Sequence, residues 1–168
     1  MTTESPSNNQ TLSVSQFQTQ RLPFYYDVIA PDGSFVRILL STVGGSMAQF
    51  DLLPGMISKP VEHRTVYEIW YFLSGQGEFW RQQGDREEIV QVDANVCITI
   101  PMGTKFQFRT IGTKSLVAVA ITMPPWPGDN EVIHVDGVWN TSLATIENSS
   151  MKLISSFHWL FILIIFFS

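Results

Sequence analysis

Hydrophobic and polar side chains alternate along the middle of the chain, as they do in half-buried β-strands. The clearest alternation covers residues 68–73, where Glu68, Trp70 and Phe72 share one face. Runs of this kind are rich in aromatic and β-branched residues and are separated by glycine, proline and aspartate turns. The pattern predicts strands at 24–30, 34–42, 46–53, 68–73, 78–82, 87–92, 96–100, 105–110 and 116–122, with a shorter strand that ends at His63.

No long stretch has a helical period, so the predicted strands indicate an all-β sandwich or barrel. The segment 123–128 contains three prolines and cannot be a central strand, because proline lacks the N–H that a strand ladder needs. We expect this segment to lie over the barrel, with Trp126 as its anchor. The acidic stretch 129–139 is expected to be a connection that carries His134 on the surface.

The two ends of the chain differ from the strand-rich middle. Residues 1–21 are polar and predict a flexible arm, residues 22–140 form the expected barrel, and residues 141–150 a linker. Residues 151–168 are strongly apolar but fall short of the roughly 20 apolar residues that span a bilayer. Three interpretations of this tail stay open: a short membrane anchor or interfacial segment, a segment packed on the barrel or on a second copy, and a non-native extension.

Composition and charge exclude some classes of function. The net charge of −5 and the pI near 5.0 argue against nucleic-acid binding, which needs a clustered basic face. Cys97 is the only cysteine, so no disulfide can form within the chain, and we expect its thiol to be buried. The N-terminus lacks the pattern of a signal peptide, which predicts a cytoplasmic protein, with membrane contact through residues 151–168 as an alternative.

The candidate chemistry lies in the stretch 55–77. His63 and Glu68 are five residues apart across a short connection, and a β-hairpin would bring the imidazole and the carboxylate to the same side. The pair could bind a metal, or act as a metal-free general base in which Glu68 holds the tautomer of His63. It could equally be a buried hydrogen-bonded pair without chemistry.

This stretch resembles the first sequence motif of the cupin superfamily. The matching spacing is Gly55-x5-Val61-x-His63-x4-Glu68-x6-Gly75, and a stretch that resembles the second cupin motif is Asn95-x5-Pro101-x-Gly103-x2-Phe106-x3-Thr110. The resemblance covers about residues 24–122. It implies a cupin-type double-stranded β-helix, also called a jelly-roll barrel, and a homodimer.

The resemblance also implies a metal site, from which this sequence departs. Cupins hold a divalent metal with two histidines and a glutamate of the first motif and a histidine of the second, and here these positions are Val61, His63, Glu68 and Phe106. His63 and Glu68 alone could be ligands, so a metal such as Fe, Mn, Ni or Zn would need further donors. The candidates are Glu62, Tyr67, Gln49, Asp51 and Gln107. The barrel is expected to hold either no metal or a single divalent metal with such borrowed ligands.

Val61 and Phe106 replace nitrogen donors with hydrocarbon, which makes the expected interior of the barrel more apolar. The aromatic candidates for a ligand-binding wall are Trp70, Phe72, Phe106 and Phe108, although these rings could also simply fill the core. The sequence favours a protein that binds a small organic molecule without a metal. The alternatives are a metal-dependent oxygenase or isomerase with His63 and Glu68 as catalytic residues, and a structural dimer module whose aromatic faces form the interface.

Overall fold

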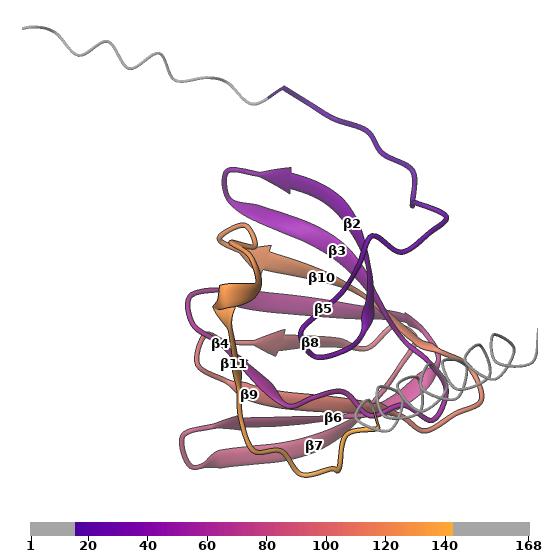
Figure 1. Cartoon of the computed structure of the whole chain (residues 1–168), viewed down its shortest axis with the longest axis vertical. Helices are drawn as coiled ribbons and strands as arrows, with labels where there is room; N and C mark the ends of the chain where they lie inside the picture. The colour runs from indigo at the N-terminus through magenta and orange to yellow at the C-terminus, as the bar shows by residue number, and fades with distance from the viewer. Residues whose placement is uncertain (1–15, 143–168) are drawn as a thin grey trace, which may run out of the picture.

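The structure, a computed structural model, describes residues 16–142, which form two antiparallel β-sheets (Figure 1). The six-stranded sheet has the order β1-β2-β3-β10-β5-β8, and the five-stranded sheet has the order β11-β4-β9-β6-β7. From β3 onward the chain changes sheet at every connection except the β6–β7 hairpin. This repeated crossing between two facing sheets is the jelly-roll arrangement, and it confirms the all-β fold class.

The observed strands agree with most of the predicted ones, but only two residues of the strand expected at 24–30 form a strand. Those of the six-stranded sheet are β1 (Val28–Ile29), β2 (Phe35–Thr42), β3 (Gly45–Leu52), β5 (Tyr67–Ser74), β8 (Cys97–Ile100) and β10 (Leu116–Met123). Those of the five-stranded sheet are β4 (Val61–His63), β6 (Gln76–Gln83), β7 (Arg86–Asp93), β9 (Lys105–Thr110) and β11 (Val132–His134). The short 3-10 helix η1 (Asp129–Glu131) precedes β11.

The alternation along β5 is the period-two pattern seen in the sequence. Glu68, Trp70 and Phe72 are buried between the sheets, whereas the intervening side chains of this strand are exposed on the outer face. Facing them from the five-stranded sheet, the ring of Phe79 stacks on Phe106 at 5.7 Å and on Phe108 at 5.4 Å between ring centroids. Burying an apolar side chain of this size stabilises the fold by about 1.5–3 kcal/mol, so these rings are the centre of the core.

The expected hairpin across residues 55–77 is wrong. β4 belongs to the five-stranded sheet and β5 to the six-stranded sheet, so the connection after His63 crosses from one sheet to the other. The turn at Gly75 is likewise not a hairpin turn, because β5 and β6 lie in different sheets. The sequence pattern of a turn is the same for a hairpin and for a crossing between sheets. A local pattern does not specify which strand becomes the pairing partner.

Glycine is required at the β5–β6 crossing by conformation and by space. Gly75 has a φ of 83°, in the left-handed region that side chains other than glycine rarely adopt. A Cβ atom at this position would also clash with the backbone of Ser115 and Leu116, which enters β10. The β5–β6 connection can therefore pass this close to the start of β10 only because the residue has no side chain.

The chain after β10 combines one correct expectation with one error. The proline-rich segment after β10 forms no strand, and Trp126 is half-buried against the barrel, as expected. The stretch 129–139, expected to be only a connection, instead contains η1 and β11, and β11 pairs with β4. His134, at the end of β11, is exposed, as predicted.

The expectation of a buried Cys97 is wrong, because its side chain is exposed on β8. β8 is an edge strand that alternates, and its buried positions are Ile98 and Ile100. The apolar neighbours of Cys97 in sequence gave no indication of which face it would take.

The predictions for the chain ends fall largely outside the described residues. Residues 16–21 are exposed and form no helix or strand. Residues 1–15 of the expected arm lie outside the described part, as do the end of the linker and the apolar tail, at 143–168. Residues Thr141 and Ser142 hydrogen-bond to the main-chain oxygen of Ile57. Within residues 16–142, no helix is long and apolar enough to cross a membrane.

Gly75→Ala should destabilise the protein more than Gly84→Ala, the matched control. Gly84 also has a positive φ, 57°, but a Cβ there meets nothing within 4 Å. We expect about 1 kcal/mol for the control from backbone strain alone, and about 1–3 kcal/mol more for Gly75→Ala from the added clash. Urea unfolding of both variants measures the difference, and equal losses would show that the approach of Ser115 is not a close constraint.

Candidate functional site

A cavity of about 440 Å³ lies between the two sheets at the end formed by β2 and β3. Its walls come from both sheets and from the segment that follows β10. They are largely apolar, and the apolar lining side chains include Val36, Ile38, Leu40, Ala48, Phe50, Val61, Trp70, Phe106, Ala120, Trp126 and Val132. His63 and Glu68 are also on the wall, so the residues singled out in the sequence lie at this cavity.

Glu68 is held in the cavity wall by β5, one residue from the start of the strand. It is only 3% exposed, and its Oε2 accepts a hydrogen bond of 2.8 Å from the indole Nε1 of Trp70, two residues further along the same face. Burial raises the pKa of Glu68 to about 8, and the charges of Asp32 and Glu131 act in the same direction, although the Trp70 hydrogen bond opposes them. Glu68 is therefore a neutral carboxylic acid at pH 7, able to donate a proton.

His63 approaches Glu68 from the opposite sheet. It is the last residue of β4, and its Nδ1 lies 3.7 Å from Oε2 of Glu68, too far for a hydrogen bond. His63 is buried, with 6% of its surface exposed, yet its Nδ1 has no hydrogen-bond partner among the described residues. Burial lowers the pKa of His63 to about 4, with a partial opposing effect of the Glu131 charge. The imidazole is thus neutral at pH 7 and has a ring nitrogen to offer.

Two aromatic rings pack against His63. Phe106 meets the imidazole edge-on at 5.2 Å between centroids, and Trp126 meets it in the same manner at 5.3 Å. Trp126 is placed by its backbone N–H, which donates a 2.9 Å hydrogen bond to Oγ of Ser46. The same Ser46 hydroxyl contacts the hydroxyl of Thr122 on β10, so the segment over the cavity is tied to the six-stranded sheet.

The four aromatic residues predicted to bind a ligand divide into two pairs. Trp70 and Phe106 line the cavity, and Trp70 stacks on Phe50, another lining ring, at 4.9 Å. Phe72 and Phe108 do not line it, because they lie deeper in the hydrophobic core of the barrel. Phe72 and Phe108 therefore fill the core, whereas a ligand-binding role of Trp70 and Phe106 stays a prediction.

Glu131 is a functional candidate that the sequence did not indicate. Its carboxylate accepts hydrogen bonds from the backbone N–H groups of Thr65 and Val66 and from the hydroxyl of Thr65. Burial alone would raise its pKa, but these hydrogen bonds and the nearby His63 lower it below the usual value. Glu131 thus holds the β4–β5 connection, which lies between His63 and Glu68. Its distance in sequence from that connection left no pattern to detect.

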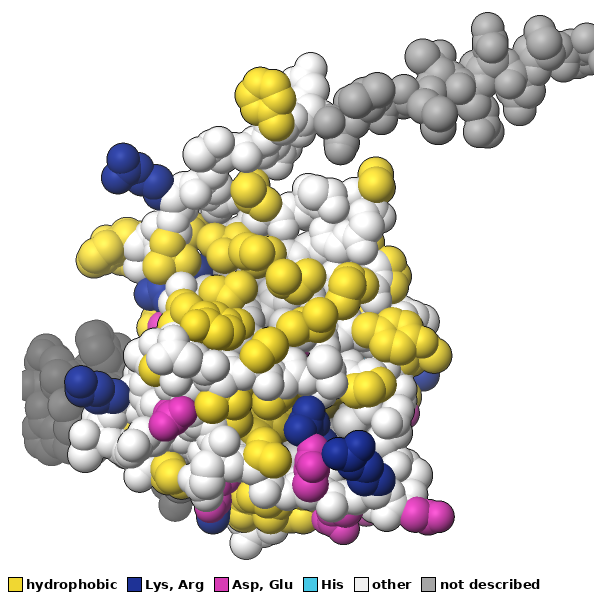
Figure 2. All heavy atoms as spheres, turned by 180° about the vertical axis from the view of Figure 1, so that it is seen from behind, with side chains coloured by type: hydrophobic (Ala, Val, Ile, Leu, Met, Phe, Trp, Pro, Cys, Tyr) yellow, Lys and Arg dark blue, Asp and Glu magenta, His cyan; other side chains and the backbone are white. Residues whose placement is uncertain are grey.

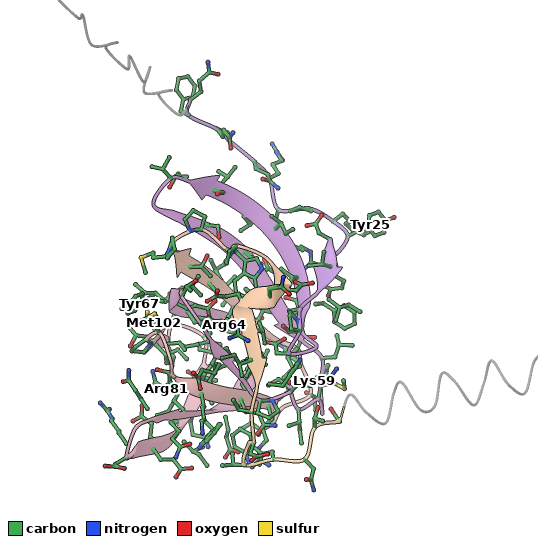
Figure 3. All side chains as sticks on the ribbon, turned by 60° about the vertical axis from the view of Figure 1, so that its left-hand side comes forward. Tyr25, Lys59, Arg64, Tyr67, Arg81 and Met102 are labelled. Carbon is green, nitrogen blue, oxygen red and sulfur yellow. The ribbon has the colours of Figure 1, made fainter. Side chains whose placement is uncertain are left out.

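Arg64 reinforces the same contact from outside. Its Nε donates a 3.0 Å hydrogen bond to the main-chain oxygen of Asn130, and Figure 3 shows its side chain beside the segment that carries η1. Asp32 is a second acidic residue missed by sequence reasoning. It lines the cavity, is buried, and accepts hydrogen bonds from the backbone N–H and hydroxyl of Ser34. Burial raises the pKa of Asp32.

The residues at the cavity do not fit the metal centre that the cupin resemblance implies. Val61 and Phe106 present only hydrocarbon at two ligand positions, and within residues 16–142 no group of three His, Cys, Asp or Glu could hold an ion. Two of the donors considered for borrowing are engaged elsewhere: Asp51 pairs with Arg37 at 2.9 Å, and Gln107 bonds the main-chain oxygen of Ser58. His63 and Glu68 alone are too few for a stable site.

Comparisons with known proteins support the fold. No protein-family model matches the sequence, and a search of curated proteins found no match. Solved structures do match, among them an uncharacterised conserved protein with a double-stranded β-helix domain from Klebsiella pneumoniae (TM-score 0.52, 15% identity, 62% of this chain and 85% of that one).

Two further matches are larger proteins. They are oxalate decarboxylase from Bacillus subtilis (TM-score 0.56, 18% identity, 64% of this chain and 29% of that one) and the capsular polysaccharide assembling protein CapF from Staphylococcus aureus (TM-score 0.56, 17% identity, 71% of this chain and 33% of that one). The matched region is about a third of their length. At such low identity the likeness shows the fold alone, which is the double-stranded β-helix that the cupin resemblance implied.

The burial of Glu68 should make stability fall as the pH rises above neutrality. Its folded pKa of about 8 exceeds the usual value of 4.5, so the folded state binds more protons than the unfolded state between these pH values. His63 acts in the opposite direction between about pH 4 and 6.5 and largely offsets Glu68 there. The loss in the free energy of unfolding should therefore be seen between pH 6.5 and 8, where it amounts to about 2 kcal/mol.

Glu68→Gln is the matched variant, because its amide oxygen still accepts the Trp70 hydrogen bond but does not titrate. Urea unfolding at pH 6.5 and pH 8 should show the loss in the wild type and little or none in Glu68→Gln. If the free energy of unfolding changed equally with pH in both proteins, Glu68 would be ionised across this range, and water would have access to its carboxylate.

Proposed function

We propose that this double-stranded β-helix protein binds an uncharged, largely apolar small molecule in the cavity between its sheets, without a metal. The observation that carries the proposal is the combination of a 440 Å³ apolar cavity with two buried polar groups, His63 and Glu68, on its wall. Small-molecule sites commonly have volumes of about 300–1,000 Å³ and a few polar groups on an apolar wall. The cavity has both properties.

The ionisable groups at the cavity support a neutral ligand. The side chains that line it in the described part of the chain include Asp32, Asp129, Glu68 and His63 but no lysine or arginine. An anionic ligand would lose its hydration in an apolar space where no lysine or arginine could pair with it, and this desolvation would outweigh the favourable contacts. A neutral molecule has no such desolvation penalty.

The polar pair gives the ligand its orientation. The protonated carboxyl of Glu68 can donate a hydrogen bond, and the neutral imidazole of His63 can accept one at the nitrogen that has no protein partner among the described residues. A ligand with one hydroxyl or carbonyl group beside an aliphatic or aromatic body matches this arrangement. The rings of Trp70 and Phe106 would contact that body.

Ala48→Phe should weaken binding, because Ala48 lines the cavity and a phenyl ring there fills part of it. The matched control is Ala94→Phe, which adds the same ring at an exposed turn between β7 and β8. Quenching of tryptophan fluorescence on titration with a panel of neutral aromatic alcohols and ketones reports binding, since Trp70 and Trp126 line the cavity. We expect saturable quenching in the wild type and the control, with affinity lower by tenfold or more in Ala48→Phe.

Equal affinity in Ala48→Phe and Ala94→Phe would place binding elsewhere and contradict the proposal. Elemental analysis of the purified protein tests the second part of it. Near-stoichiometric Fe, Mn, Ni or Zn that is lost in His63→Ala would favour the metal-dependent enzyme instead.

The outer face of the six-stranded sheet supports a second proposal, that the protein is a homodimer. The outward side chains of the central strands β5 and β10 are all apolar or aromatic, and exposed ones include Tyr67, Ile69, Tyr71, Leu73 and Ile121. Figure 2 shows hydrophobic side chains gathered on the upper part of this side of the molecule. A face without charge at its centre is complementary to itself, as pairing about a two-fold axis requires.

Ile69→Lys should convert the dimer to a monomer, because it places a charge at the centre of this face. The matched control is Ile89→Lys, at an exposed position of β7 on the other sheet. Size-exclusion chromatography with light scattering should give twice the chain mass of 19.0 kDa for the wild type and the control, and the chain mass for Ile69→Lys. A monomeric wild type, or dissociation in both variants, would contradict the use of this face.

A further inference from the structure

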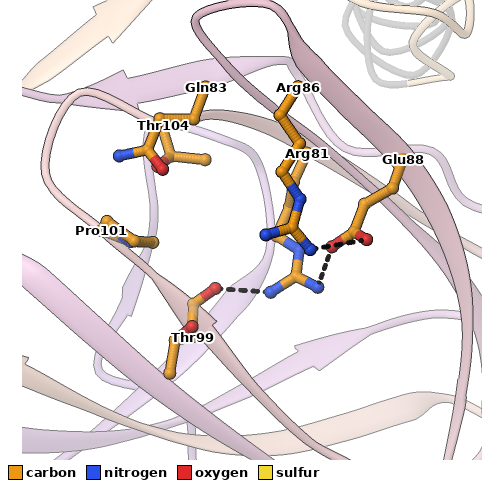
Figure 4. A pocket seen from close by; sticks show the side chains of 7 residues that line it. All are labelled: Arg81, Gln83, Arg86, Glu88, Thr99, Pro101 and Thr104. Atoms are coloured by element: carbon orange, nitrogen blue, oxygen red, sulfur yellow. Dashed lines mark hydrogen bonds and ion pairs between the residues drawn. The ribbon is translucent and has the colours of Figure 1, made fainter.

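We infer that a second pocket, separate from the cavity, binds a small oxyanion such as phosphate or a carboxylate. It lies where the edge strand β8 faces the adjoining ends of β6 and β7 (Figure 4). Its volume is about 160 Å³, and its lining includes Arg81, Arg86, Glu88 and Thr104. It shares no lining residue with the cavity, so the inference does not rest on the proposed function.

The pocket has an excess of positive charge. Arg81 and Arg86 both reach Glu88: Nη2 of Arg81 lies 2.5 Å from Oε1, and Nη2 of Arg86 lies 3.4 Å from Oε2. One carboxylate thus faces two guanidinium groups, and these three side chains carry a net charge of +1. Figure 4 shows both arginines turned toward Glu88, with Thr104 across the pocket from them.

Two buried hydrogen-bond donors at the pocket have no partner among the described residues. They are Nε of Arg81 and the hydroxyl of Thr104, and Thr104 is only 2% exposed. The Nη1 of Arg81 is already used, because it donates a 2.6 Å hydrogen bond to the main-chain oxygen of Thr99. Buried donors are nearly always paired in folded proteins, so these two atoms call for an acceptor.

An oxyanion satisfies both conditions, since it supplies negative charge and several acceptor oxygens. A cation would be repelled by the two guanidinium groups, and an apolar group would leave the two donors unpaired. The volume corresponds to roughly five water molecules at about 30 Å³ each, which admits a phosphate or a short carboxylate and excludes a nucleotide. Arg86, with 80% of its side chain exposed, lies at the entrance and can close over the anion.

The test is an NMR titration of the full chain with sodium phosphate and, separately, with sodium acetate, at constant ionic strength held by sodium chloride. We expect saturable shifts of the amides of Arg81, Thr99 and Thr104 with at least one of the two anions. Saturation with phosphate alone or acetate alone identifies the chemical class. No saturable shift with either anion overturns the inference.

Variants separate a built site from general attraction of anions. Thr104→Val removes the unpartnered hydroxyl at nearly constant shape, and Arg86→Gln removes one charge at an exposed position where folding is not at risk. Each should weaken binding by about tenfold or more, the usual effect of losing a hydrogen bond to a charged group. Arg21→Gln removes the same charge from the exposed N-terminal segment and should leave the affinity unchanged. Equal weakening by Arg86→Gln and Arg21→Gln would overturn the inference.

Discussion

The burial of a carboxyl group between two apolar sheet faces determines the protonation state of the polar groups inside this barrel. Glu68 is buried because β5 alternates strictly, and the face that carries it also carries Trp70 and Phe72 into the interior. An ionised carboxylate is costly in such surroundings, so the group keeps its proton, and the neighbouring His63 stays neutral for the same reason. His63 and Glu68 thus present hydrogen-bonding groups without charge to the cavity.

The cavity and the second pocket differ in chemistry although both are lined by residues of the same strand pair, β6 and β9. Phe106, on the wall of the cavity, is paired across the sheet with Arg81, which lies at the second pocket. The two side chains of this pair lie on the same face of the sheet. Hydrocarbon surrounds Phe106 and charged groups surround Arg81, so the two proposed sites would take neutral and anionic molecules, respectively.

Much of the fold was predictable from the sequence, because the strands are specified by local alternation and the turns by glycine and proline. Four residues that the sequence singled out also line one cavity: His63, Glu68, Trp70 and Phe106. Strand pairing was not predictable, as the absent hairpin between β4 and β5 shows, since pairing depends on contacts distant in sequence. For the same reason Glu131 was missed: its role comes from hydrogen bonds to a connection 65 residues away.

Glu131 also links the segment over the cavity to the geometry of the polar pair. It sits at the end of the segment that carries Trp126 over the cavity, and its carboxylate holds the main chain of Thr65 and Val66. The segment over the cavity and the carboxylate that holds the connection between His63 and Glu68 are thus one continuous piece of chain. The spacing of the polar pair therefore depends on the position of this segment.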